Sequence, residues 1–287
     1  MATALDALLA ELDGIGTVPT SSAQLFALIG NPKAGPEDFE RVVRPDVGLT
    51  ANLLKCANSV FYRGSREITS AREAINRMGL RRVFEVAASA SFAKTIPPRL
   101  AGYDCSSKEY WSHSVAVAVL ADRIGRAAGF TYPDLAFTAG LLHDLGKVVV
   151  ATWAATQARP PSFHSIEAER EVLGTDHAEL GEKLALSWRL PKEICSGARW
   201  HHDPESAPSA TLRYLATVVQ LADGAAHVGG FGEGPEVSMP LHADALERLN
   251  LEPAGVHGII DAAGDEVERT SGLLTSAAAP RGVSIAA

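Results

Sequence analysis

The sequence has little that points to an oxidising or exported environment. It contains only three cysteines, Cys56, Cys105 and Cys195, which form no CxxC pair and leave an odd count. A disulfide framework needs an even set of cysteines, so we expect three free thiols and a cytoplasmic protein. Residues 1–12 alternate acidic and apolar side chains and lack the basic start of a signal peptide, which favours the same compartment.

Long apolar runs and clusters of basic residues are also scarce. The most apolar stretches, around residues 115–121 and 148–155, are far shorter than the ~20 residues of a membrane span. The chain has 26 basic and 34 acidic residues, a formal charge of −8, and no long basic run. We therefore expect no membrane partner, and the acidic balance argues against nucleic acid as the main partner.

Strand-like alternation is absent, whereas short amphipathic runs with helix start and stop signals recur along the chain. With 287 residues, 46% of them hydrophobic, the chain can bury one large core or two small ones. We expect an all-α fold. The expected helices cover residues 6–12, 23–29, 37–43, 46–58, 70–78, 80–96, 107–128, 133–154, 166–173, 175–188, 191–202, 209–226, 240–249 and 253–274.

Proline and glycine mark the expected boundaries between groups of helices. The pair Pro97-Pro98 stops the helix before it, because proline cannot continue a helix. Glycines at positions 229, 230, 232 and 234 form a second, softer linker. The expected parts are an N-terminal helical lobe at 14–98, a second lobe at 99–228, and a C-terminal helical extension with a frayed end at 229–287.

The most informative feature is a series of histidines and aspartates in the second half of the chain. Within it, His143 and Asp144 are adjacent and flanked by leucines, where burial is unfavourable unless a cation or a polar cluster compensates. Imidazoles and carboxylates suit divalent Fe, Mn or Zn, and a bridging aspartate often holds two ions. We expect a site for such metals, with two ions. Its candidate ligands are His113, His143, Asp144, His177, His201, His202 and Asp223.

The sequence gives further expectations for four of these candidate ligands, and for some it leaves two interpretations open. His201 and His202 point about 100° apart on a helix, so at least one should face the site. His177 begins a helix, whose dipole should lower the basicity of the imidazole and favour the neutral, metal-binding form. Asp223 either points inward at a cation or is an ordinary aspartate near a helix end.

Glu109 and Lys147 are candidates beside the series. Glu109 lies four residues before His113 and could be a further ligand on the same helix face, but with Ser106 it also fits a capping box. Lys147 would suit a substrate phosphate as a point charge, or it is a solvated lysine at a helix end. Asp144 and Lys147 are the candidate catalytic residues. Gly146, between them, could let a ligand approach the backbone.

The remaining histidines fit no place in the series, and we expect them to be surface or hydrogen-bonded residues. They are His164, His227, His242 and His257. The tryptophans, at helical core spacings, are expected to serve packing rather than stacking on a ligand.

Several sequence blocks occur in an order that resembles a known family. The N-terminal blocks are Thr17-Val-Pro-Thr20, Asp46-Val-Gly-Leu-Thr50, Leu53-Leu-Lys-Cys-Ala-Asn-Ser59, Phe61-Tyr62 and Ala74-Ile-Asn-Arg-Met-Gly79. The later blocks are Trp111-Ser-His-Ser114, Ala139-Gly-Leu-Leu-His-Asp-Leu-Gly146, Asp176-His-Ala-Glu-Leu-Gly181, Trp188-Arg-Leu-Pro191 and His201-His202. Over about residues 14–228 they resemble the HDOD family, the HD-related output domain of bacterial signalling proteins within the HD superfamily. Val47 departs from the proline usual there, which we expect to alter a turn only.

The resemblance implies two packed helical lobes, the C-terminal one an HD-like bundle, and a role in bacterial signal transduction. The implied partner is a signalling protein or a small phosphorylated ligand, and a homodimer is left open. We therefore expect a regulatory protein with a dinuclear HD-type metal site that acts by binding. The alternatives are a metal-dependent phosphohydrolase acting on a phosphodiester or nucleotide, and a di-iron oxygenase with the same ligand order. Cyclic-di-GMP hydrolysis is disfavoured. The HD-GYP branch, which has that activity, needs a Gly-Tyr-Pro-containing loop at this point, and none follows His202 in this chain.

Overall fold

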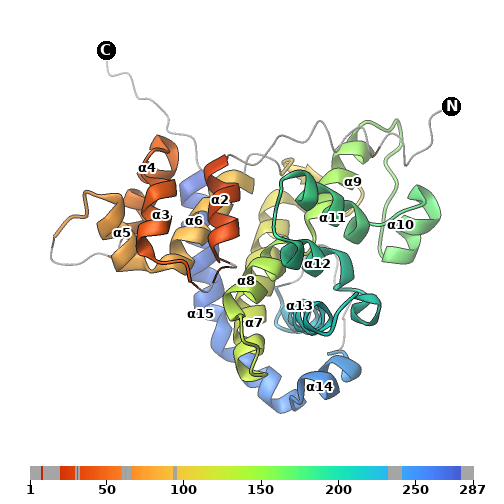
Figure 1. The fold of residues 1–287 in the computed structure, drawn as a ribbon. Helices are drawn as coiled ribbons and strands as arrows, with labels where there is room; N and C mark the ends of the chain where they lie inside the picture. The colour runs from red at the N-terminus through yellow and green to blue at the C-terminus, as the bar shows by residue number, and fades with distance from the viewer. Residues whose placement is uncertain are drawn as a thin grey trace. The chain divides into compact units, whose positions relative to one another are not determined.

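A computed structural model describes Leu8 and residues 20–29, 31, 33–59, 62, 66–92, 96–231 and 241–278 of the chain. These residues are mostly helical, with one two-stranded hairpin, so the expected all-α class is confirmed (Figure 1). The expected helix at 6–12 and the turn beginning at Thr17 fall largely outside the described residues.

The chain divides into two compact units. The smaller unit comprises residues 18–94 and 269–287, and the larger comprises residues 1–17 and 95–268. Residues 229–268 therefore belong to the larger unit, and the last helix, α15 (Pro253–Ala278), supplies residues to both. The division into lobes expected from the sequence stays a prediction.

The smaller unit is built on α6 (Leu80–Phe92), which contacts α2 (Thr20–Ile29), α4 (Val47–Ala57) and α5 (Ala71–Met78); α3 (Pro36–Val43) packs on α2 and α5. Its core includes Phe26 and Phe84, whose rings meet edge-to-face with centroids 5.0 Å apart. Each such buried ring contributes roughly 1.5–3 kcal/mol.

The start of α4 explains the tolerance of the unusual Val47. The Asp46 carboxylate caps the helix by accepting a hydrogen bond from the Leu49 N–H at 2.9 Å. Val47 then occupies the first helical position and is 82% exposed. Proline is favoured at that position because its missing N–H would have no helical partner there. Either residue therefore fits the first turn.

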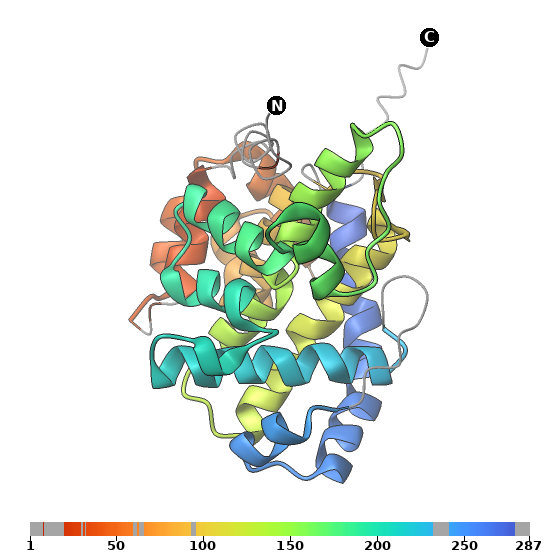
Figure 2. The ribbon, with the colours of Figure 1, turned by 90° about the vertical axis from the view of Figure 1, so that its right-hand side faces the viewer.

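The larger unit is a bundle of helices (Figure 2). Within it, α7 packs on α8 and α13, α11 packs on α9 and α12, and α12 contacts both α8 and α13. Short helix α14 packs on α13. The elements are α7 (Ser107–Ala127), α8 (Pro133–Leu142), α9 (Leu145–Ala155), α10 (Ile166–Leu173), α11 (His177–Ser187), α12 (Lys192–Trp200), η1 (Pro204–Ser206), α13 (Ala210–Val228) and α14 (Ala243–Leu249).

The single helix expected at 133–154 is wrong, because α8 ends before His143 and α9 begins after Asp144. Asp144 leaves helical geometry, with φ −98° and ψ 13°. In an uninterrupted helix two adjacent side chains point about 100° apart. The break turns both toward the core, where His143 Nε2 lies 3.2 Å from Asp144 Oδ2.

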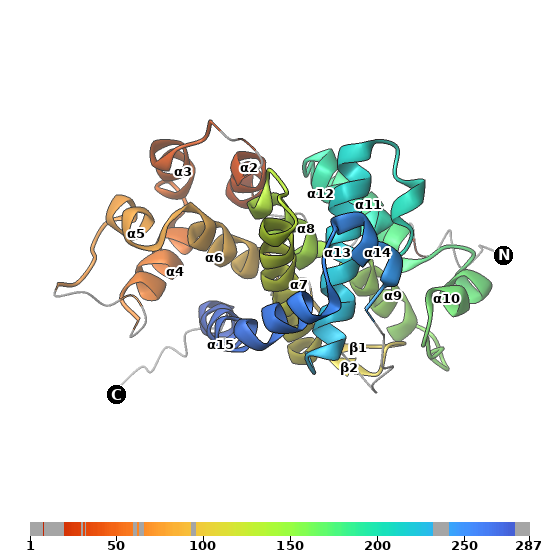
Figure 3. The same ribbon diagram turned by 90° about the horizontal axis from the view of Figure 1, so that it is seen from below.

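The structure also contains a short β-hairpin, whereas no strands were expected from the sequence. β1 (Arg99–Leu100) pairs antiparallel with β2 (Cys105–Ser106), beside α7 and α9 (Figure 3). Strands of two residues are too short to give an alternating pattern. The hairpin places Tyr103 in its turn, which becomes important at the site below.

By length and mean hydropathy (1.3), residues 133–155 could cross a membrane, contrary to the expectation from shorter runs. However, 89% of the apolar window is buried inside the fold, as in the core helix of a bundle. The stretch also contains His143, Asp144 and Lys147, which face one another rather than an apolar surrounding.

Candidate metal centre

Seven side chains from five segments converge in the larger unit. His113 comes from α7, His143 and Asp144 from the break between α8 and α9, His177 from α11, and Asp223 from α13. The last two, His201 and His202, follow α12, and both face the cluster. All except the partly exposed His202 are buried.

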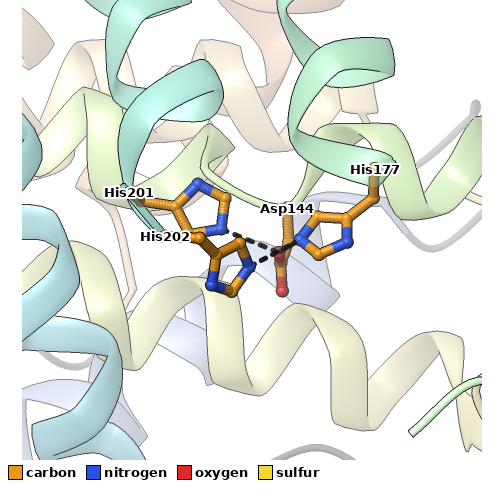
Figure 4. Close-up of side chains that lie close together, drawn as sticks. All are labelled: Asp144, His177, His201 and His202. Atoms are coloured by element: carbon orange, nitrogen blue, oxygen red, sulfur yellow. Dashed lines mark hydrogen bonds and ion pairs between the residues drawn. The ribbon is translucent and has the colours of Figure 1, made fainter. Parts of the chain in front are cut away.

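Asp144 lies at the centre of the cluster (Figure 4). Its Oδ1 is 3.2 Å from His177 Nε2 and 3.6 Å from His201 Nε2, while its Oδ2 is 3.2 Å from His143 Nε2. The two carboxylate oxygens thus face two different sets of imidazoles. This arrangement is typical of a carboxylate that bridges two ions.

The other end of the cluster is organised around Asp223. Its Oδ1 lies 3.2 Å from His113 Nε2, 3.8 Å from His143 Nε2 and 3.6 Å from His227 Nε2. The donor atoms of the cluster form overlapping groups, each within 4.8 Å. These groups are Asp144, His177, His201 and His202; His113, His143 and Asp144; and His113, Asp223 and His227.

The second nitrogen of four imidazoles is already engaged outside the cluster. The Nδ1 atoms of His113, His143 and His201 lie 2.9, 2.7 and 2.8 Å from the carbonyls of Phe231, Gly140 and Ala198, and Nδ1 of His177 lies 2.8 Å from the Glu169 carboxylate. Carbonyl and carboxylate oxygens only accept, so each Nδ1 carries the hydrogen and donates it. The Nε2 lone pairs of the neutral rings then face the cluster, as metal-ligating histidines require.

This tautomer leaves buried acceptors opposed to one another. Nε2 of His143 and Nε2 of His201 are fully buried and have no hydrogen-bond partner among the described residues. Both nonetheless lie close to Asp144 oxygens, lone pair against lone pair. Leaving a buried polar atom unsatisfied costs about 1–3 kcal/mol, and a cation between the two acceptors would remove that cost. The donor set therefore fits a divalent metal.

The protonation states of most ligands favour metal binding. Burial and the neighbouring histidines lower the pKa of His201 to about 3 and hold that of His202 well below its usual value. Burial alone would favour neutral carboxyls, but the adjacent histidines, with Lys147 beside Asp144, hold the pKa values of Asp144 and Asp223 well below the usual range. Neutral imidazoles and ionised carboxylates are the forms that ligate metals.

The expected low basicity of His177 is wrong. His177 does begin α11, and burial also disfavours its charged form. The Glu169 and Asp144 carboxylates outweigh both effects and raise the pKa of His177 to about 10. At neutral pH and without a cation, this ring therefore carries a proton between its Nε2 and Asp144, in the place that a metal would take.

Gly146 lets α9 and α11 cross at close range, which brings Asp144 and His177 together. A Cβ on Gly146 would lie 1.8 Å from the His177 carbonyl oxygen and 2.6 Å from the Gly181 nitrogen. Only glycine therefore lets α9 and α11 approach this closely. The close approach expected at Gly146 is thus made by a neighbouring helix backbone, and it fixes two candidate ligands beside each other.

Four residues of the cluster line a cavity of about 420 Å³: Asp144, His177, His202 and Asp223. Lys147 lies at its edge, with Nζ 2.6 Å from Asp144 Oδ2 and 5.6 Å from the centroid of the Tyr103 ring. It is 17% exposed, so it is not the solvated lysine of the alternative interpretation. Besides the ligand candidates, the wall includes Tyr103, Lys147, Phe163, His164, Glu167 and His227.

Glu109 lies outside the cluster, which corrects its assignment as a candidate ligand. Its carboxylate accepts the Ser106 N–H at 2.7 Å, and Ser106 Oγ accepts the Glu109 N–H at 3.2 Å, so the pair forms the capping box. The Glu109 side chain is exposed, and its hydrogen bonds to Ser106 lower the pKa of the carboxyl. The cap holds the start of α7 rather than a metal.

We expect Glu109→Ala to leave the metal content of the purified protein unchanged and to lower its melting temperature by only about 2–4 °C, the usual loss for one helix cap. Elemental analysis beside a thermal melt checks this. A fall in metal content to half or less would return Glu109 to the ligand set.

Three residues of the site were missed from the sequence. His227 lies four residues after Asp223 on α13, a spacing that could have placed it on the same face. Glu169 and Tyr103 gave no signal, because only in the folded chain does Glu169 reach His177 from α10 and Tyr103 reach Glu169 from the hairpin turn. Of the other histidines outside the series, His257 and His164 are exposed as expected, although His164 lines the cavity.

Comparisons with known proteins find relatives that match part of this chain. An uncharacterised protein of Treponema pallidum is 30% identical over 225 residues, which are 72% of this chain and 41% of that protein. Ribonuclease Y of Thermus thermophilus is 35% identical over 144 residues, half of this chain but 21% of the ribonuclease. The chain thus spans less than half the length of either relative.

A solved structure shares the fold over nearly the whole chain. The HDOD domain protein of unknown function from Geobacter sulfurreducens aligns with a TM-score of 0.68 and 23% identity, covering 95% of this chain and 97% of that one. The family model of the HDOD domain matches residues 15–204. The resemblance drawn from the sequence blocks is confirmed: this chain belongs to the HDOD domain family.

Proposed function

We propose that the cluster binds two divalent transition metals, for which Asp144 would be a shared ligand, and that the cavity beside it hydrolyses a phosphodiester in a bacterial signalling process in the cytoplasm. The observation that carries the proposal is the convergence of buried Nε2 and carboxylate acceptors in a cluster that opens to the cavity through Asp144, His177, His202 and Asp223. The sequence favoured binding without catalysis. The cavity favours hydrolysis, because a substrate phosphate can reach the ligands and Lys147 together.

The candidate ligands would divide between two ions. His113, His143, Asp144 and Asp223 would hold one, and Asp144, His177, His201 and His202 the other. Fe, Mn and Zn suit this mixture of imidazoles and carboxylates. Bound there, such ions supply Lewis-acid charge to a phosphate and lower the pKa of water.

The chain's own residues orient the substrate. The Lys147 ammonium, held by Asp144 at the edge of the cavity, can place its charge on a phosphate oxygen without being a ligand. Tyr103 and Phe163 form an apolar wall beside it, and buried helices close the far side of the cluster against water. The proposal for a phosphodiester is supported by the likeness to ribonuclease Y, whose name gives it an RNA substrate.

A second candidate is binding without turnover. Membership of the HDOD family favours a signalling role. In that role the same cavity would retain a metal and a small phosphorylated ligand while another surface contacts a signalling partner. The two candidates differ in one measurable respect, the release of product.

The test is an assay of Mn-, Fe-, Co- and Zn-loaded protein with bis(p-nitrophenyl) phosphate. We expect turnover, and we expect Lys147→Met to lower kcat by about 10- to 100-fold while the metal content stays unchanged, because a positioned charge is lost. Lys183→Met is the matched control, since Lys183 pairs with Glu179 outside the cavity. Absence of product in all four metal forms would leave binding without turnover as the function.

A further inference from the structure

A buried carboxylate stands behind one of the proposed ligands. We infer that Glu169 is the positioning residue of His177, and that Tyr103 connects this residue to the wall of the cavity. The inference rests on the proposed metal site. It adds that the Glu169 carboxylate, called the anchor below, holds the half of the site that contains His177. Through Tyr103 the anchor contacts the cavity wall on which a ligand would lie.

Glu169 holds His177 at two points. Both carboxylate oxygens lie 2.8 Å from Nδ1 of the His177 ring, and Oε2 also accepts the backbone N–H of His177 at 2.6 Å. Ring rotation and movement of the first residue of α11 would each break a charge-assisted hydrogen bond. The Glu169 side chain comes from α10 and is 2% exposed, so water does not compete for these contacts.

This anchor differs in kind from those of the other rings. His113, His143 and His201 donate their Nδ1 hydrogens to backbone carbonyls, whereas His177 donates to a carboxylate. A carboxylate partner raises the basicity of the opposite nitrogen and so strengthens it as a metal ligand. The ion held by His177 should therefore bind more tightly than an otherwise equivalent ion with carbonyl-supported rings alone.

Tyr103 extends the anchor to the cavity. Its hydroxyl donates to Glu169 Oε1 at 2.9 Å, while its ring lines the cavity 5.6 Å from the Lys147 ammonium. The hairpin turn that carries Tyr103 is fastened by the Phe163 N–H, which donates to the Gly102 carbonyl at 2.7 Å. A ligand lying on the Tyr103 ring would press on the same side chain that supports Glu169.

The experiment compares Glu169→Gln with Glu167→Gln by titrating Co²⁺ into metal-free protein in competition with a chelator. Both glutamates lie in α10 and line the cavity, but Glu167 is exposed and only Glu169 holds His177. We expect Glu169→Gln to weaken one of the two Co²⁺ ions by about 10- to 100-fold and to change the visible Co²⁺ spectrum. Glu167→Gln should match the wild type in both measurements.

Tyr103→Phe provides an independent variant that removes one hydrogen bond and keeps the ring. We expect it to weaken the same ion by about 2- to 10-fold. Circular dichroism of the metal-free protein shows whether Glu169→Gln folds. If it does not fold, the Co²⁺ affinity of Tyr103→Phe becomes the test of the inference. Two Co²⁺ ions bound with wild-type affinity and spectrum in folded Glu169→Gln, or in Tyr103→Phe when Glu169→Gln is unfolded, would overturn the inference alone. A wild-type protein that binds no Co²⁺ would overturn the proposed metal site and the inference together.

Discussion

Asp144→Ala is expected to abolish metal binding in both halves of the cluster. Asp144 is the residue whose two oxygens face both sets of imidazoles, so its loss removes the bridge and not merely one ligand. A metal present at ~1,000 times its Kd stabilises the folded protein by about 4 kcal/mol. The variant should therefore melt about 8–16 °C below the metal-loaded wild type.

Asp122→Ala is the matched control for this experiment. Asp122 is also a buried aspartate of the larger unit, but it pairs with Arg126 and lies outside the cluster. Its replacement should destabilise the fold while the metal content stays at the wild-type value. An Asp144→Ala protein with full metal content and an unchanged melting curve would show that Asp144 does not belong to the site.

Gly146→Ala is expected to have an effect of similar size by a different route. The added Cβ would meet backbone atoms of α11 at 1.8 and 2.6 Å, and backbone cannot move aside as a flexible side chain does. Forcing α9 and α11 apart should destabilise the protein by about 3 kcal/mol or more. It should also weaken metal binding, because His177 moves away from Asp144.

Gly258→Ala tests whether this effect is specific to the crossing. Gly258 is also helical, but a Cβ there would meet nothing within 4 Å. Alanine is the better helix former, so this variant should be neutral or slightly more stable. Thermal melts of both variants, with and without added metal, check the prediction. Equal melting temperatures would contradict the close crossing of α9 and α11.

The sequence predicted the helical class and several helix bounds, because these depend on local signals. The helix of residues 166–173 was placed at its observed bounds, since Ser165 caps it and Gly174 ends it in a left-handed conformation. The break at His143-Asp144 was missed because neither residue is a proline or a glycine, and the nearby Gly146 did not show where the helix ends. It arises where the side chains turn inward, which is a tertiary effect.

The site was predictable in its residue types and less so in its surroundings. The expected ligand series converges except for Glu109, although its role as a set of metal ligands stays a prediction. The local capping geometry of Glu109 was one of two alternatives that the spacing could not separate. The basicity of His177 was misjudged because Glu169, eight residues earlier, reaches it only when α10 folds back.

The central claim is that this cluster is a metal site, and the most direct test is elemental analysis of protein purified without chelator. The account predicts about one to two divalent transition metals per chain, lost in Asp144→Ala and retained in Asp122→Ala. Less than about a tenth of an equivalent in the wild type, even after reconstitution with Fe, Mn and Zn, would contradict it.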